Sequence, residues 1–534
     1  MGETNRLLLM GNEAVARAAV DAGVILGSGY PGTPATEILE EFARLGGKAQ
    51  WAPNEKVALE VGIGVAYAGA RMLVAMKHVG VNVAADPLFT AAYTGVTGAL
   101  VLVSADDPDM HSSQNEQDNR NYSRAAGIPT LEPADAQESY DMFLKAVEIS
   151  ERWGTPVMLR MTTRVCHSKG LVQQNGKIAS PQKPHFVHDI PARLMVPGYA
   201  RPAHRKLRKK LVEIKDWNEA SGPNQVFEGS SDLGIITSSV SYLHAREAAP
   251  DASICKIGMC YPFPDNFVRN FAKKVKRCVV IEEGDPYLVE YCRYSGIAVE
   301  GKDEMYRHGE LNVGRVQRIL AGDTSTEPVY PPGNPPKLCS DCPHRTISGI
   351  MADQQLIVAG DIGCYTLGGL PPLEAMDSCV CMGASIGVGL GLRHALPPEE
   401  AKKVVSVIGD STFVHAGITG LVDMAYNPPP TGHVVIIVDN GTTAMTGLQE
   451  HPGTGRTLTH KATRKLSFEN LAKAIGLDKV HVIDPVANKE EFDKLLKESL
   501  ESEELVLIIA RRLCSLGAPK LEAYERATGR QGSA

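Results

Sequence analysis

Almost wholly apolar runs recur along the chain and alternate with segments of helical period. Up to about residue 190, strands are expected over 24–27, 72–77, 99–105 and 156–160, and helices over 13–22, 36–45, 56–70 and 136–153. A strand that is apolar on both faces is typical of a parallel sheet covered by helices. This region therefore predicts a doubly wound α/β layer.

The same pattern returns twice further along the chain. Strand-like runs at 233–237, 253–257 and 278–282 predict a smaller α/β domain, and runs at 404–409 and 436–438 predict another. The proline-rich, basic stretch 181–225 suits a connection that contains an amphipathic helix, and the proline-rich segment 330–336 marks a second boundary. The expected fold is three doubly wound parallel-sheet α/β domains, at 1–190, 191–329 and 330–534.

Composition narrows the class of protein. A chain of 534 residues is too long for one core and suits three domains. The net charge of -7 argues against nucleic acid as a partner. No apolar run approaches the roughly 20 residues of a membrane span, and the N-terminus lacks a signal segment, so a cytoplasmic protein is expected. There the 11 cysteines are expected to be core thiols or metal ligands.

Two of the strands end in polar residues suited to a diphosphate and a metal ion. The run 404–409 ends in Gly409 and is followed by Asp410 and Ser411, and Asn440 follows the second run, 31 positions after Gly409. Asp410, the Asn440 side chain and the Thr442 carbonyl would give Mg²⁺ the hard oxygen ligands it prefers. The pattern resembles the thiamine diphosphate motif, with Ser411 where many members have glycine. Either half alone could be an ordinary strand-to-loop turn.

The segment 54–69 is a helix pattern with many small residues. An ionised carboxylate pointing from such a helix into a tight interface needs a partner, so Glu60 is a candidate functional group. Thiamine diphosphate enzymes carry a glutamate nine residues before a glycine, which hydrogen-bonds the pyrimidine ring, and Glu60 and Gly69 have that spacing. Glu55 is the competing candidate for this role. The non-functional interpretation of Glu55 is a solvent-facing residue at the helix start, where the helix dipole favours a negative charge.

Two loops of the first region are candidates for ligand contacts. Residues 27–32 fit the dinucleotide pattern G-x-G-x-x-G, but Pro31 removes a backbone donor, so a sharp loop with Thr33 as the cap of the next helix is preferred. The polar stretch 106–120 follows a strand and either lines a substrate pocket or forms a solvated loop.

Cysteines cluster in the last domain. Cys339 and Cys342 form a C-x-x-C, Cys364 follows, and Cys379 and Cys381 come shortly after. Such a set binds zinc or an iron–sulfur cluster, and spacing alone does not choose between them. A zinc ribbon would need a second C-x-x-C, which is absent, so the fourth ligand must lie elsewhere. Cys514, after the strand-like run 505–510, is the candidate.

Taken together, the motifs resemble the large subunit of indolepyruvate:ferredoxin oxidoreductases, in the 2-oxoacid:ferredoxin oxidoreductase superfamily. The resemblance covers nearly the whole chain and is carried by 29–34, 54–57, 77–83, 112–118, 339–344, 360–365, 381–385 and 442–447. It implies that domain 1–190 binds the thiamine pyrimidine, that 191–329 is a connection with a transketolase C-terminal-like domain, and that 330–534 binds diphosphate, Mg²⁺ and iron–sulfur.

The resemblance also implies roles for individual residues. Thr33 would lie near the substrate carboxylate, Gly383, Gly409 and Ser411 would line the cofactor with Asp410, Asn440 and Thr442, and Cys339, Cys342, Cys364 and Cys514 would hold a [4Fe–4S] cluster. The implied reaction is oxidative decarboxylation of an arylpyruvate-like 2-oxoacid to acyl-CoA and CO₂. A small gamma-type subunit and ferredoxin are the implied protein partners.

The given sequence departs from the resemblance at its end. Family members usually continue into a module with two C-x-x-C-x-x-C-x-x-x-C-P runs, and no such run is present here. We therefore expect electrons to pass to another polypeptide or a different acceptor. Two alternatives stay open: a non-oxidative 2-oxoacid decarboxylase, and a non-catalytic subunit of an electron-transfer complex, against which Glu60, Asp410 and Asn440 argue.

Overall fold

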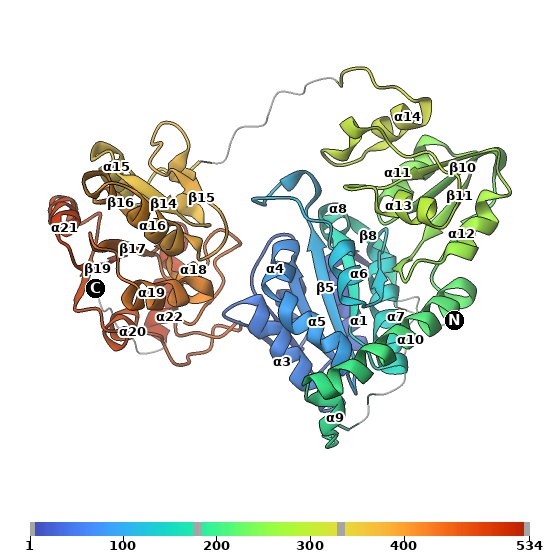
Figure 1. Cartoon of the computed structure of the whole chain (residues 1–534), viewed down its shortest axis with the longest axis horizontal. Coiled ribbons are helices and arrows are strands. Elements are labelled where there is room, and N and C mark those ends of the chain that lie inside the picture. Colours follow the sequence, from blue (N-terminus) through green and yellow to red (C-terminus); the bar gives the residue numbers. More distant parts are fainter. Residues whose placement is uncertain (1–5, 175–180, 182, 328–336, 528–534) are drawn as a thin grey trace. The chain divides into compact units, whose positions relative to one another are not determined.

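The computed structural model describes residues 6–174, 181, 183–327 and 337–527 (Figure 1). The chain forms two compact units, Met1–Pro328 and Val329–Ala534, which are described separately. Across the described residues, no helix is long and apolar enough to span a bilayer.

The first unit is built on a seven-stranded sheet in the order β12-β6-β7-β5-β4-β2-β3. All neighbouring strands are parallel except β12, which pairs antiparallel with β6 although it comes from much later in the chain. The strands are β2 (Leu26–Gly29), β3 (Ala49–Trp51), β4 (Met72–Lys77), β5 (Leu100–Asp106), β6 (Thr130–Leu131), β7 (Val157–Thr162) and β12 (Met259–Tyr261). A separate antiparallel ribbon joins β1 (Arg6–Met10) to β8 (Lys169–Gln173).

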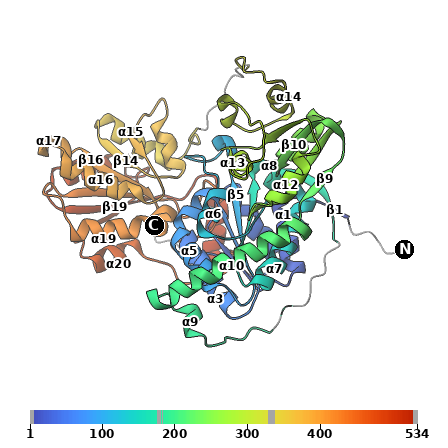
Figure 2. The ribbon, with the colours of Figure 1, turned by 45° about the vertical axis from the view of Figure 1, so that its right-hand side comes forward.

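Helices cover this sheet in layers (Figures 1 and 2). One layer packs into a core cluster with the strands and contains α3 (Glu55–Tyr67), α5 (Ala85–Thr94) and α10 (Pro197–Ser221). In another, α1 (Gly11–Asp21) packs against α2 (Thr36–Arg44) and α7 (Ala136–Trp153). The helix expected in the basic connection is thus confirmed as α10, and it is a packed part of the first unit. The other helices here are α4 (His78–Val83), α6 (Arg120–Ala126), α8 (Thr163–His167), α9 (Ile190–Arg193) and the 3-10 turn η1 (Pro108–Met110).

A smaller sheet completes the first unit, in the order β13-β10-β11-β9, with only β9 antiparallel. Its strands are β9 (Gln225–Phe227), β10 (Ser230–Ser238), β11 (Ala252–Ile257) and β13 (Arg277–Ile281), so the three strands expected here are confirmed. Its helices are α11 (Ser241–Ala248), α12 (Asp265–Ala272), α13 (Tyr287–Tyr294), α14 (Val313–Ala321) and the turn η2 (Glu304–Arg307).

The second unit contains one fully parallel six-stranded sheet in the order β15-β14-β16-β17-β19-β18. Its strands are β14 (Ile357–Gly360), β15 (Ser378–Cys379), β16 (Val404–Gly409), β17 (His433–Asp439), β18 (Lys479–Ile483) and β19 (Leu505–Arg511). Its helices are α15 (Pro343–Asp353), α16 (Ala384–Ala395), α17 (Pro398–Ala401), α18 (Asp410–Thr412), α19 (Ile418–Tyr426), α20 (Phe468–Ile475), α21 (Lys489–Glu501) and α22 (Ala518–Ala527), with the turns η3 (Cys364–Gly369) and η4 (Phe413–Gly417).

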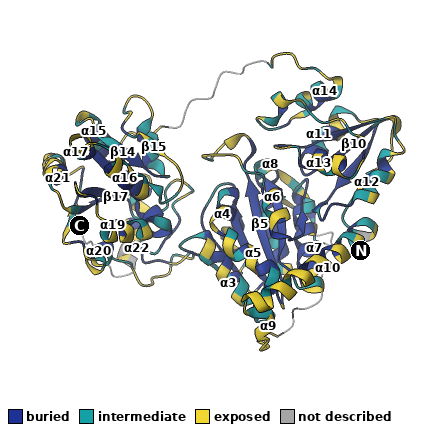
Figure 3. Ribbon diagram, viewed as in Figure 1, coloured by how far each residue is buried: buried dark blue, intermediate teal, exposed yellow. Residues whose placement is uncertain are grey.

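Strand β17 is buried along nearly its whole length and is dark blue in Figure 3. Its side chains alternate between two cores, one on each face of this sheet. Val434 and Ile436 join a cluster with α15 and α21, whereas Val435 and Ile437 join a cluster with α16, α19 and α20. Successive side chains of a strand point to opposite faces, so an all-apolar strand must be covered twice. The doubly wound fold read from the apolar runs is therefore confirmed.

The two large sheets have the same topology. When the six parallel strands of each are numbered in chain order, both read 2-1-3-4-6-5. In such a sheet the chain leaves the strands numbered 1 and 3 in opposite directions, which opens a crevice between their two loops. Ligands bind in this crevice, beyond the carboxyl ends of the two strands. Those strands are β2 and β4 in the first unit and β14 and β16 in the second, so ligands are expected at the loops that follow them.

Candidate active site

The carboxyl end of β16 carries Asp410, which is buried. Its oxygens accept hydrogen bonds from the backbone N–H of Ser411 and of Gly441, both at 2.8 Å, and lie 3.2 Å from His451 Nε2. Burial by itself would raise the pKa of Asp410, but His451 and these backbone donors lower it below its ordinary value. The chain thus holds an ionised carboxylate at the switch point of the sheet, as a divalent cation requires.

The loop after β17 brings further oxygen atoms to the same place. Asn440 is buried, its Oδ1 accepts the Thr442 N–H at 3.2 Å, and its Nδ2 lies 3.4 Å from His344 Nε2. Burial lowers the pKa of His344 to about 4, so this neighbour is uncharged at neutral pH. Two predicted Mg²⁺ ligands therefore converge without a competing cation from His344, and the donor set fits a hard divalent ion.

Glycines predicted to meet the cofactor are also needed by the protein's own packing. A Cβ on Gly409 would lie 2.8 Å from the Tyr365 ring, and one on Gly383 would lie 2.5 Å from Ala416. Gly383 also has φ of +89°, a left-handed conformation that favours glycine. Ser411 follows Asp410, and its hydroxyl lies 2.8 Å from the Thr443 hydroxyl.

Asp361, which sequence reasoning passed over, organises the start of α16. The side chain is fully buried and accepts the N–H groups of Gly383 at 2.8 Å and Ser385 at 3.1 Å. A carboxylate at a helix N-terminus satisfies backbone donors and opposes the positive end of the helix dipole. The sequence does contain a pattern that could have identified Asp361. Gly360-Asp361 follows an apolar run, as Gly409-Asp410 does.

The fold brings together the four cysteines predicted to hold a cluster. The Cys339–Cys342 turn precedes α15 and is fixed by Arg345, whose Nε donates to the Cys339 carbonyl at 2.6 Å, while Cys364 follows β14 and Cys514 follows β19. Burial, together with the neighbouring Cys342, Cys514 and Cys339, raises the pKa of the Cys364 thiol to about 11. The Cys514 N–H donates to the Asn440 carbonyl at 3.0 Å, so this set adjoins the Asp410 site.

The two remaining thiols of this unit differ from that group in exposure. Cys379 and Cys381 are exposed, whereas the four predicted cluster ligands are partly buried. Within the described ranges, no three His, Cys, Asp or Glu side chains lie close enough to share one metal ion. This is compatible with both predicted groups, since Mg²⁺ would have a single carboxylate here and each cysteine of a [4Fe–4S] cluster binds a different iron.

In the first unit, the two candidate carboxylates of α3 differ in environment. Glu60 pairs with Lys56 on the helix surface, and its side chain is 43% exposed. Glu55 is 4% exposed and packs so tightly on α4 that a Cβ on Gly80 would lie 2.6 Å from its Cγ. Gly69 itself has φ of +77° directly after α3, so the turn of the backbone accounts for the glycine.

The loop after β2 places Thr33 at the switch point of the first sheet. The prediction of Thr33 as helix cap is wrong, because α2 begins at Thr36 and its N-cap residue is Ala35. The Thr36 hydroxyl instead reaches back to accept the Gly32 N–H at 3.0 Å, which closes the loop. Gly32 packs against the stem of Lys77, the last residue of β4.

The stretch 106–120 is held by a network of buried charges. Arg160 donates to Asp106 at 2.6 Å, Asp106 accepts the Asn119 N–H at 3.1 Å, and Arg120 pairs with Asp118. Arg120 also donates to Glu282 at 2.8 Å, which joins the loop to the smaller sheet. Burial opposes ionisation of Asp118, yet Arg120 and Arg160 lower its pKa to about 2.

This network yields a stability prediction. Arg120→Met should lower the free energy of unfolding by about 3–5 kcal/mol, because it leaves buried Asp118 and Glu282 without their shared cation. The change is measurable as a lower urea midpoint of tryptophan fluorescence, since all three tryptophans lie in the first unit. Arg277→Met, in an exposed pair with Glu300, is the control and should cost about 0–1 kcal/mol. Equal midpoints for the two variants would contradict the role given to the network.

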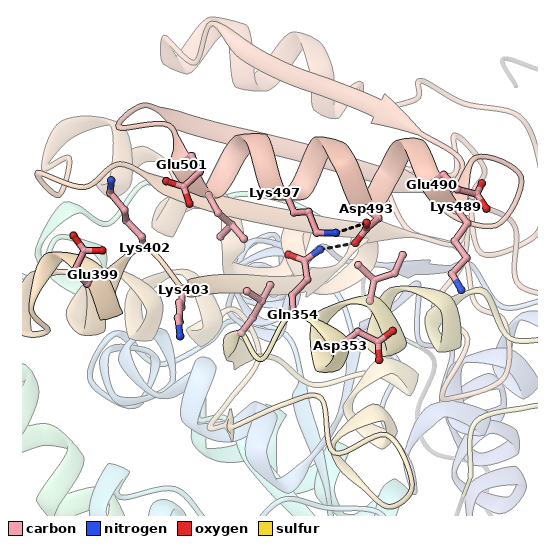
Figure 4. Close-up of a pocket in the computed structure, with 13 residues that line it drawn as sticks. Asp353, Gln354, Glu399, Lys402, Lys403, Lys489, Glu490, Asp493, Lys497 and Glu501 are labelled. Atoms are coloured by element: carbon pink, nitrogen blue, oxygen red, sulfur yellow. Dashed lines mark hydrogen bonds and ion pairs between the residues drawn. The ribbon is translucent and has the colours of Figure 1, made fainter.

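A cavity of about 930 Å³ lies in the second unit (Figure 4). Lys403 lines it just before β16 begins, whereas Asp410 follows the other end of that strand. Polar groups that line the cavity are partly paired with one another. Asp493 accepts a hydrogen bond from the Gln354 amide at 2.7 Å and another from the Lys497 ammonium at 2.6 Å. We assign the chemistry to the carboxyl edge of the sheet, where the polar loops meet.

Comparisons with known proteins define the class. The family described as "Pyruvate flavodoxin/ferredoxin oxidoreductase, thiamine diP-bdg" matches residues 17–187, and "Thiamine pyrophosphate enzyme, C-terminal TPP binding domain" matches 361–510. The first match contains the six parallel strands of the first sheet, and the second contains β15 to β18 and nearly all of β19. The structure of a 2-oxoglutarate:ferredoxin oxidoreductase from Magnetococcus marinus is similar in fold, with a TM-score of 0.51, 17% identity and coverage of 60% of this chain and 65% of that one. The two family matches thus give this chain thiamine diphosphate-binding domains, the first of them of the 2-oxoacid oxidoreductase type.

Two relatives with higher sequence identity to this chain show the family to which it belongs. Indolepyruvate oxidoreductase subunit IorA of Archaeoglobus fulgidus is 38% identical over 99% of this chain and 89% of its own length. The IorA subunit of Methanothermobacter thermautotrophicus strain Delta H is 38% identical over 97% of this chain and 88% of its own. The chain belongs to the IorA family of indolepyruvate oxidoreductase subunits.

Proposed function

We propose that this protein oxidatively decarboxylates a 2-oxoacid, an arylpyruvate such as indolepyruvate, to acyl-CoA and CO₂. The electrons would pass through a [4Fe–4S] cluster to ferredoxin or another acceptor, and a small gamma-type subunit would complete the enzyme. The observation that carries this proposal is the convergence of Cys339, Cys342, Cys364 and Cys514 next to the Asp410 loop. A decarboxylase without electron transfer has no need of four neighbouring thiols.

The residues of the second unit would bind the cofactor. Asp410, the Asn440 side chain and the Thr442 carbonyl would hold Mg²⁺, and Gly383, Gly409 and Ser411 would lie along the diphosphate. Thiamine diphosphate, when bound, supplies the nucleophilic carbon that adds to the 2-oxo group. The ionised state of Asp410 and the neutral state of His344 keep the local charge favourable for a divalent ion.

In the first unit, a carboxylate of α3 would hydrogen-bond the pyrimidine ring and promote loss of the proton from the reacting carbon. The nine-residue spacing to Gly69 selects Glu60, whereas burial favours Glu55. A buried carboxylate keeps a bound proton in place, and an exposed one that pairs with lysine exchanges freely with water. Thr33, at the switch point, would contact the substrate carboxylate.

Glutamine variants distinguish the two carboxylates. On the structure, Glu55→Gln should lower turnover by about 100-fold or more, because glutamine keeps the shape but removes the group that shares a proton. Glu60→Gln should be mild, because the exposed Lys56 pair contributes little. Steady-state turnover, with cofactor affinity measured in parallel, decides between them. The reverse order of effects would restore the spacing argument and Glu60.

The proposed function is tested by anaerobic assay of the protein purified with its associated subunits. Indolepyruvate and coenzyme A, with thiamine diphosphate and Mg²⁺ present, should reduce an added viologen dye or ferredoxin and yield acyl-CoA. Production of the aldehyde alone, with no acceptor reduction, would contradict the oxidative reaction and favour the simple decarboxylase.

A further inference from the structure

We infer that Lys77 is the cation that binds the carboxylate of the 2-oxoacid, an inference that rests on the proposed function and specifies its substrate contact. Lys77 ends β4, so its side chain starts at the carboxyl edge of the first sheet, beside the loop that follows β2. This is the switch point at which ligands of doubly wound sheets bind. No role was assigned to this lysine from the sequence.

The ammonium group of Lys77 is buried without a matching anion. The residue is 9% exposed, and within the part of the chain that the structure describes no carboxylate oxygen lies within 4.0 Å of Nζ. Its one hydrogen bond there is donated to the Ser112 carbonyl, which leaves two N–H donors of the ammonium for another acceptor. A buried charge is costly unless it is paired, so this site is suited to an anionic ligand.

The surroundings match a small carboxylate. A Cβ on Gly32 would lie 3.1 Å from the Lys77 Cβ, so the loop that carries Thr33 rests directly on the lysine stem. On another side lie Ser112 and Ser113, held by Asp107, which accepts the Ser112 N–H at 2.8 Å and the Ser113 hydroxyl at 2.5 Å. The lysine is thus fixed between the two loops that the sequence suggested for substrate contact.

Charged and titratable neighbours do not neutralise the lysine. Burial lowers the pKa of Lys77 to about 8, although Asp107 and Glu55 oppose this shift, and the charge of Lys77 in turn helps to lower the pKa of His78. Asp107 uses its oxygens on Ser112, Ser113 and Thr163. At neutral pH the lysine is therefore mostly protonated and can attract an acid.

The chemistry of decarboxylation determines which kinetic constant should respond. When CO₂ leaves, the bonding electron pair stays on the former keto carbon and the negative charge of the carboxylate disappears. A cation on that carboxylate stabilises the bound substrate at least as much as the transition state, so it contributes to binding more than to the chemical step. Lys77→Met should raise KM by about 10- to 100-fold, with a much smaller change in kcat. This is the loss of affinity expected when one hydrogen bond to a charged group is removed.

The direct test measures binding without turnover. We would titrate the thiamine diphosphate-loaded enzyme complex with 3-(indol-3-yl)propanoate, which has a carboxylate but no keto group, and with its uncharged amide. Wild type should prefer the acid by about tenfold or more, and Lys77→Met should abolish the preference. The wild-type preference should also weaken from pH 7 to pH 9, as Lys77 loses its proton, whereas Lys77→Arg should keep it at both values.

Lys210→Met is the matched control. Burial lowers the pKa of Lys210 to about 8 as well, and this lysine also donates to a backbone carbonyl, that of Gly154 at 2.8 Å, but it lies on α10. Its loss should leave the acid preference unchanged. Lys77→Met should not lower the urea midpoint, because a buried charge is removed, whereas a structural lysine would destabilise on replacement.

An unaltered acid preference in Lys77→Met, an equal loss in Lys210→Met, or no preference in wild type would overturn the assignment. Failure of the proposed function would be seen separately, as absence of 2-oxoacid-dependent acceptor reduction by the wild-type complex. Because the titration needs no turnover, failure of the lysine assignment can be distinguished from failure of the proposed function.

Discussion

Asp410→Ala should abolish Mg²⁺-dependent binding of thiamine diphosphate and with it all turnover. Asp410 is the only carboxylate in the predicted Mg²⁺ ligand set, and the structure holds it ionised at the end of β16. Loss of an outer-sphere partner alone costs about 10- to 100-fold in metal affinity, so loss of the ligand should cost about 100-fold or more. Calorimetric titration of thiamine diphosphate in the presence of Mg²⁺ measures the effect.

Two further variants make that result specific. Asp410→Asn keeps the size of the side chain and an acceptor for one of the two N–H groups, that of Ser411 or of Gly441, but removes the charge, so it should retain the fold and still lose affinity. Asp484→Ala is the matched control, since Asp484 also follows a strand of this sheet but pairs with Arg512 at the surface. Unchanged cofactor affinity in both Asp410 variants would mean that the strand-end motif has been misread.

Cys364→Ser should remove iron from the protein and stop electron transfer. If the four neighbouring cysteines hold one cluster, anaerobically purified protein should contain about four irons per chain. Serine is a poor ligand for such a cluster, so iron content, visible absorbance and acceptor reduction should all fall towards zero. Thiamine diphosphate binding should persist, because Asp410 and its hydrogen bonds are untouched.

Cys379→Ser is the control for the cluster, because Cys379 is an exposed thiol of the same unit outside the group of four. Its iron content should equal that of wild type. Zinc in place of iron, or full oxidative activity in Cys364→Ser, would defeat the redox assignment and favour the non-oxidative decarboxylase.

Much of the fold was predictable because its strands are buried on both faces. The apolar runs at 72–77 and 404–409 coincide with β4 and β16, since continuous burial leaves a pattern that needs no knowledge of the neighbours. The short edge strands β3 and β15 were not predicted. Edge strands bury less surface, so their sequences carry little apolar signal.

The carboxylates of α3 show where local patterns stop being informative. Glu55 and Glu60 are five residues apart, which places them about 140° apart around the helix. Sequence spacing admits either as the functional group. Only the packing of α4 against Glu55, and the exposure of Glu60 beside Lys56, separates them.

By itself, the sequence predicted α/β layers built on mainly parallel sheets, strands that end in Gly-Asp and Asp-Asn steps, and thiols that gather in the last third of the chain. Those features depend on residues close together in the chain. The tertiary structure alone decided the common strand order, the meeting of Cys514 with Cys339, Cys342 and Cys364, and the burial of Lys77 without a carboxylate partner among the described residues. These depend on contacts between segments that are far apart in the chain. Hydrophobic periodicity shows which faces of a helix or strand are buried, but it does not show which distant segment covers them.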